Sequence, residues 1–153
     1  MKIVALSLTM VILMTACKKE SSPSKTDNIT GTRWGLTKYT LESPLGQTPV
    51  DITLTTFKPC ELDDPIYFKA GGSFSAADSN VICVPANNSI FYSLSGGSWA
   101  FTNGDSVITI NKASQTQAFR IKTLTASNIE MYQQQNNNLG QLVRYTYFLR
   151  AVE

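Results

Sequence analysis

From Ile29 onward the sequence predicts an all-β protein, an antiparallel meander that either closes into a barrel or folds as a sandwich. Apolar residues recur with a period of two, and Thr, Tyr, Phe, Val and Ile are abundant. No segment in this region has the periodicity of an amphipathic helix. Short connections between the apolar runs favour hairpins between consecutive strands.

Ten segments are expected to form strands, and turn residues separate several of them. Asn103 and Gly104 lie between two alternating runs, which is a strong hairpin signal. The segments "TASN" and "QNNNLGQ" punctuate the next two connections, and we expect the second to be a flexible hairpin loop. The expected strands are residues 32–41, 50–54, 65–70, 72–77, 90–95, 98–102, 106–111, 118–125, 128–135 and 142–151.

Alternation along each strand predicts which side chains face the interior. In the last strand, alternate residues from Val143 to Leu149 share the inner face. The opposite face of that strand is expected to be solvated apart from Phe148. The side chains expected to fill the core or to line a cavity are Trp34, Phe68, Phe74, Trp99, Phe101, Phe119, Ile121, Met131, Tyr145 and Tyr147.

Length and charge exclude several classes of protein. A chain of 153 residues has room for one domain with its own core. The net charge of +2 falls close to neutrality once Lys2 and the basic patch of Lys18, Lys19 and Lys25 are set aside, so no nucleic-acid partner is expected. Histidine is absent, which excludes histidine-based triads and zincin motifs. We therefore expect no enzyme, no cofactor and no metal site.

The N-terminus has the pattern of an export signal. Met1 and Lys2 precede "IVALSLTMVILM", which suits the apolar region of a secretory signal and falls short of the roughly 20 residues that span a bilayer. A buried N-terminal strand or helix is the alternative. It is disfavoured because the run leads directly into "CKKESSPSKTD", which is too polar to pack.

The segment "MTAC" resembles the lipobox of bacterial lipoproteins, although Met14 stands where leucine is usual. The resemblance implies a signal peptide over residues 1–16, lipid attachment at Cys17, a flexible tether over 17–29 and a folded domain over 30–153. Lys18 rather than aspartate after the cysteine favours the outer membrane, on its periplasmic or surface side. A plain signal peptide with a leftover thiol is the alternative.

Two cysteines remain once Cys17 is assigned to lipidation. Cys60 and Cys83 are an even number in an oxidising compartment, which predicts a disulfide between them, with two buried thiols as the alternative. Closing a loop of roughly 24 residues would stabilise the domain by about 3 kcal/mol. Two thiolates without histidine do not make a complete metal-ligand set.

The order of motifs in the body resembles the lipocalin-like domains of small Gram-negative lipoproteins. The motifs are "GTRWGLTKYT", "CELDDPIYFKAGGSF", Cys83 and "GGSWAFTNGDSVITI", within residues 30–150. The resemblance implies an eight-stranded up-and-down barrel, whose interior is either filled by side chains or holds a cavity for one small ligand. It also implies that a basic residue of the last strand, Arg150 or Arg144, packs over Trp34, although the segment from Gly31 to Trp34 is one residue longer than the Gly-x-Trp of true lipocalins. An exposed strand arginine is the alternative.

These expectations give two functional hypotheses. The first is a monomeric, membrane-anchored barrel that binds a small apolar ligand. The second is a structural or interaction module with a filled core and an unidentified protein partner. The carboxylates of "ELDDP" (61–65) are expected to lie in a solvated turn rather than in a calcium or acid–base site. The "DSV" segment resembles a short O-glycosylation motif at Ser106, and three residues recur by chance.

Overall fold

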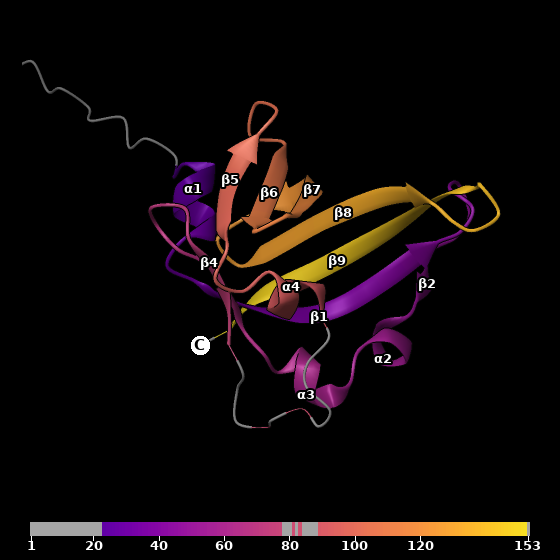
Figure 1. Cartoon of the computed structure of the whole chain (residues 1–153), viewed down its shortest axis with the longest axis horizontal. Helices are drawn as coiled ribbons and strands as arrows, with labels where there is room; N and C mark the ends of the chain where they lie inside the picture. The colour runs from indigo at the N-terminus through magenta and orange to yellow at the C-terminus, as the bar shows by residue number, and fades with distance from the viewer. Residues whose placement is uncertain (1–22, 78–80, 82, 84–88, 153) are drawn as a thin grey trace, which may run out of the picture.

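The structure is a computed structural model that describes residues 23–77, 81, 83 and 89–152. In this part of the chain eight antiparallel strands form a nearly closed barrel (Figure 1). Consecutive strands of the barrel pair with each other except β4 and β5, which is the expected up-and-down order, and β9 returns to pair with β1. The strands are β1 (Arg33–Glu42), β3 (Ile66–Phe68), β4 (Phe74–Ala76), β5 (Ser98–Thr102), β6 (Val107–Lys112), β7 (Gln115–Leu124), β8 (Asn128–Asn136) and β9 (Leu142–Val152).

The barrel closes through a short contact between β4 and β5. The Phe74 N–H donates to the Gly97 carbonyl over 2.9 Å, and the Trp99 N–H donates to the Gly72 carbonyl over 2.7 Å. The long pairs β1–β9 and β8–β9 form the opposite wall (Figure 1). The barrel is therefore held strongly on one side and by a few hydrogen bonds on the other.

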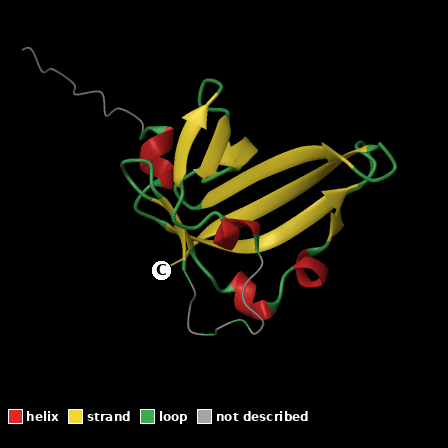
Figure 2. Ribbon diagram, viewed as in Figure 1, coloured by secondary structure: helices red, strands yellow, loops and turns green. Residues whose placement is uncertain are grey.

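Four short helices accompany the strands in the described residues (Figure 2). They are α1 (Lys25–Ile29), α2 (Thr53–Thr56), α3 (Pro59–Leu62) and α4 (Ile90–Ser93). Two of them replace expected strands. The strand expected at 50–54 is only β2 (Val50–Asp51), because the Asp51 carboxylate accepts from the Thr53 N–H over 2.9 Å and starts α2.

The strand expected at 90–95 is wrong, since these residues begin with helix α4. The Ser89 hydroxyl accepts from the Tyr92 N–H over 3.2 Å and caps the helix. Phe91 and Leu94 are buried on one side of this turn. Two apolar residues that are three positions apart fit the spacing of a helix. In a segment this short, the aromatic and β-branched composition favoured a strand more strongly than that spacing favoured a helix.

The flexible tether expected over residues 17–29 is also wrong for its last part. Residues 25–29 form α1, and Ser24 and Asp27 form a reciprocal capping box at its start. Ile29 is fully buried, and its carbonyl accepts from Trp34 Nε1 over 3.0 Å. The packed part of the chain therefore begins before residue 30.

The core gathers all ten side chains that were expected to fill it or to line a cavity. Trp34, Phe68, Phe74, Trp99, Phe119, Met131 and Tyr147 are buried, and Phe101, Ile121 and Tyr145 are half-buried against them. Other buried members were not anticipated, among them Tyr39, Phe57 and Phe91. The strand faces were thus predicted well, and the contributions of the helical segments were not.

Candidate functional site

Side chains fill the barrel interior, which is the alternative to the lipocalin-like cavity that the sequence left open. The ring of Phe91, carried in by α4, lies 5.4 Å from the ring of Tyr147 and 5.7 Å from that of Phe119. The hollow beside it, lined by Leu36, Phe57 and others, has a volume of about 10 Å³. That is about the space that one water molecule needs.

A larger hollow of about 170 Å³ lies at the barrel mouth. Tyr39, Phe57 and Tyr147 line it, and the ring of Tyr39 lies 4.6 Å from that of Tyr147 and 5.3 Å from that of Phe57. The Tyr147 hydroxyl is 3.3 Å from the side-chain oxygen of Gln133 and 3.5 Å from the Tyr39 hydroxyl. Burial raises the pKa of both tyrosines, so both are neutral near pH 7.

The expected solvated turn of "ELDDP" is wrong for two of its carboxylates. Asp63 is exposed, but Glu61 and Asp64 are buried below the barrel mouth. Glu61 accepts from the backbone N–H of Lys58 over 2.9 Å at the start of α3. In the described part of the chain no group of three or more Cys, Asp or Glu residues is placed to hold a metal ion.

The Cys60–Cys83 disulfide is confirmed. The two Cα atoms are 5.4 Å apart, and the bond ties α3 to the segment that follows β4. Cys17, the expected lipid-attachment residue, lies outside the described residues, as do the signal-peptide residues 1–16. None of the helices in the described ranges is long and apolar enough to cross a membrane.

A hollow of about 530 Å³ lies on the outer face of the barrel, across β7, β8, β9 and β1. We call it the outer groove, and it is lined by Lys38, Thr40, Glu42, Pro49, Ile121, Lys122, Glu130, Tyr132, Arg144, Thr146 and Phe148. The register of β1 and β9 builds it, since Lys38, Thr40 and Glu42 stand opposite Phe148, Thr146 and Arg144 respectively. Side chains at such positions share one face of the sheet.

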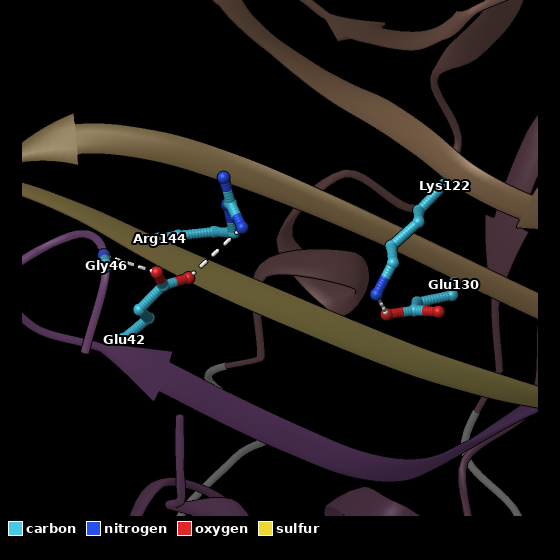
Figure 3. A network of polar contacts seen from close by, with 5 residues as sticks. All are labelled: Glu42, Gly46, Lys122, Glu130 and Arg144. Carbon is cyan, nitrogen blue, oxygen red and sulfur yellow. Dashed lines mark hydrogen bonds and ion pairs between the residues drawn. The ribbon is translucent and has the colours of Figure 1, made fainter. Parts of the chain in front are cut away.

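Two ion pairs lie along this groove (Figure 3). Arg144 of β9 reaches toward Glu42 of β1, with Nη1 3.1 Å from one carboxylate oxygen. The other oxygen accepts from the N–H of Gly46, in the loop that follows β1. Lys122 of β7 reaches Glu130 of β8, with 2.8 Å between Nζ and the carboxylate. The carboxylates therefore already have cationic partners.

Cations also lie over both aromatic rings of the outer groove. The Arg144 guanidinium is 5.0 Å from the centre of the Tyr132 ring, and Lys38 Nζ is 5.7 Å from that of Phe148. Beneath them Thr40 and Thr146 are buried, although both lie on the outer face. Thr146 was expected to be solvated. Larger side chains on neighbouring strands bury it, and the sequence alone does not show that they are neighbours, because this depends on the register of four strands.

Arg150 does not pack over Trp34, so that expectation is wrong. Arg150 stands opposite Gly35, and Trp34 stands opposite Ala151, so the two side chains lie on opposite faces of the sheet. Arg150 is exposed, the alternative considered for it, and lines a second outer hollow of about 350 Å³. This hollow shares Glu130 and Phe148 with the outer groove and therefore continues it.

The barrel is compatible with a calycin-like fold. Comparison of the sequence with protein-family models and with curated proteins finds no match.

Proposed function

We propose that this chain is a lipid-anchored envelope protein whose lipocalin-like barrel is an interaction module that binds its partner on the outside. The observation that carries the proposal is the filled interior. Phe91 packs against Phe119 and Tyr147, whose rings also contact each other at 5.5 Å, and the hollow beside it holds about 10 Å³. The outer groove, with about 530 Å³ and both charged and aromatic side chains, offers more room and more chemistry.

The anchor is the part of the proposal that rests on sequence alone. Lipidation at Cys17 would hold the barrel at the outer membrane, because several acyl chains bind a bilayer far more firmly than one. Cys17→Ser should abolish labelling by a radioactive fatty acid and leave the barrel folded. Labelling that persists in this variant would refute the assignment.

The interaction itself can be tested by photo-crosslinking in intact cells. A photoreactive phenylalanine analogue in place of Tyr132 would sit in the outer groove, and the same analogue in place of Leu54 would sit on α2, away from the groove. We expect a crosslinked product from the groove position and none from Leu54. Uncrosslinked monomer at both positions would argue against an interaction module.

A small apolar ligand at the barrel mouth is the second candidate, favoured by the aromatic lining of the 170 Å³ hollow. The chain would then bind its ligand between Tyr39, Phe57 and Tyr147. Native mass spectrometry and displacement of a fluorescent lipid test this directly. Saturable displacement that is lost in Ile90→Trp, which narrows the mouth, would favour the ligand over the interaction module.

A further inference from the structure

We infer that the outer groove binds an acidic oligosaccharide. The inference rests on the proposed function, since it names the class of ligand for the same surface. The groove and its continuation present four cations, Lys38, Lys122, Arg144 and Arg150, against the two carboxylates of Glu42 and Glu130. Both carboxylates are already paired with cations, so the surplus charge of this face is positive and suits an anion.

The position of the groove on the sheet disfavours a peptide ligand. Peptides commonly add to the free edge of a sheet, where the backbone supplies hydrogen bonds. The strands β1, β9 and β8 each have a hydrogen-bonded neighbour on both sides. A ligand in the groove therefore meets side chains, and it must carry its own hydroxyl and anionic groups to be recognised.

The spacing of the side chains suits an extended ligand. Along β9 the outward positions alternate from Arg144 through Thr146 and Phe148 to Arg150. At about 3.4 Å per residue, the two arginines stand roughly 20 Å apart along the strand. An oligosaccharide with a carboxylate at intervals can reach both cations, as a compact anion cannot.

The chemistry between the two arginines suits sugar rings. Tyr132 and Phe148 are half-buried on the outer face, and apolar faces of sugar rings can pack on aromatic rings of this kind. Thr40, Thr146 and the paired carboxylates lie alongside and can exchange hydrogen bonds with sugar hydroxyls. A simple polyanion would use the cations and leave this polar and aromatic surface without a role.

The Arg144 guanidinium is partly exposed in the groove and can meet a ligand carboxylate. Arg144 Nε is fully buried, and among the described residues it has no hydrogen-bond partner. Leaving a buried charged donor without an acceptor is unfavourable. A carboxylate bound in the groove would meet the exposed part of the same guanidinium rather than Nε itself, because the Arg144 side chain is 36% exposed.

Isothermal titration calorimetry of the folded protein with three probes tests the inference. The probes are oligogalacturonate, its methyl ester and poly-L-glutamate. We expect saturable binding of oligogalacturonate, at least about tenfold weaker binding of the uncharged ester, and no saturable binding of the acidic peptide. Equal binding of poly-L-glutamate would show that the groove does not select a saccharide over another polyanion. The absence of oligogalacturonate binding would overturn the whole inference.

Substitutions locate the binding. Arg150→Gln and Tyr132→Ala should each weaken oligogalacturonate binding by about tenfold or more, and thermal unfolding shows whether each variant is folded. Lys69→Gln makes the same charge change at an exposed position that does not line the groove, and should leave binding unchanged. An equal loss in Lys69→Gln would show that net charge alone binds the saccharide and would refute the groove.

The two proposals fail in distinguishable ways. If oligogalacturonate does not bind but the photoreactive group at Tyr132 still forms a product in cells, the interaction module stands and the saccharide is wrong. If oligogalacturonate binds with the expected loss in Arg150→Gln, the absence of a cellular protein crosslink does not count against the groove as a binding surface.

Discussion

Replacing Phe91 by alanine should remove the plug of the barrel. The Phe91 side chain is 3% exposed and packs against the rings of Phe119 and Tyr147, at 5.7 and 5.4 Å. Truncating a buried phenylalanine removes its transfer free energy and leaves a cavity, which together cost about 3 to 5 kcal/mol. Because a small domain is stable by about 5 to 15 kcal/mol, Phe91→Ala should be folded but close to its limit.

Urea unfolding monitored by tryptophan fluorescence measures this cost, since Trp34 and Trp99 are both buried in the core. Ser93→Ala is the matched control, because Ser93 lies on the same helix and is exposed. The control should change the free energy of unfolding by no more than about 0.5 kcal/mol.

A second measurement separates a plug from ordinary packing. If Phe91→Ala opens a dry cavity, benzene should raise the melting temperature of the variant and leave that of the wild type unchanged. A loss in stability below about 1 kcal/mol, with no response to benzene, would show that Phe91 does not fill the barrel. The barrel interior would then have room for a ligand.

Three further predictions follow from the same packing. Breaking the disulfide with Cys60→Ser and Cys83→Ser together should lower the free energy of unfolding by about 3 kcal/mol, measured in urea, and unchanged stability would contradict the loop-closure argument. Gly97→Ala should lower the free energy of unfolding by more than about 2 kcal/mol, because the added Cβ would collide with the backbone carbonyl of a residue on β6, beside the barrel closure. A melting temperature equal to that of the wild type would refute this. Burial raises the pKa of Tyr39 and Tyr147 above the unfolded value near 10. The stability that the two neutral tyrosines contribute to the fold is therefore fully present below about pH 10 and is lost as the pH rises further. The variant with phenylalanine at both positions should lose less stability than the wild type between about pH 9 and pH 11, and parallel losses would contradict the assignment.

The long strands could be predicted from the sequence because their side chains alternate between a buried and an exposed face. In β9 Val143, Tyr147 and Leu149 are buried on the inner face as expected, and the pairs β5–β6, β7–β8 and β8–β9 follow the turn signals between them. The disulfide could be predicted because removing Cys17 left a single pair. These features depend on local periodicity or on counting, and both can be read without three-dimensional information.

The short helices and the outer groove could not be predicted in this way. Helix α4 has four residues, too few to show a helical period against an aromatic composition that favours strands. The outer groove depends on register, since a slip of one residue between β1 and β9 would remove the pairing of Glu42 with Arg144. A bulge between Leu36 and Lys38 sets that register, and the sequence gives no sign of it.

The same bulge connects the two faces of the barrel. Beyond it Tyr39 points inward to Tyr147, and Lys38 points outward to Phe148. The strands that carry the aromatic plug of the interior therefore also carry the charged and aromatic side chains of the outer groove. A filled core holds these strands rigid, and rigid strands keep an exposed set of side chains in place for a ligand. Filling the interior thus supports binding on the outside, and a variant such as Phe91→Ala should weaken binding in the outer groove without touching it.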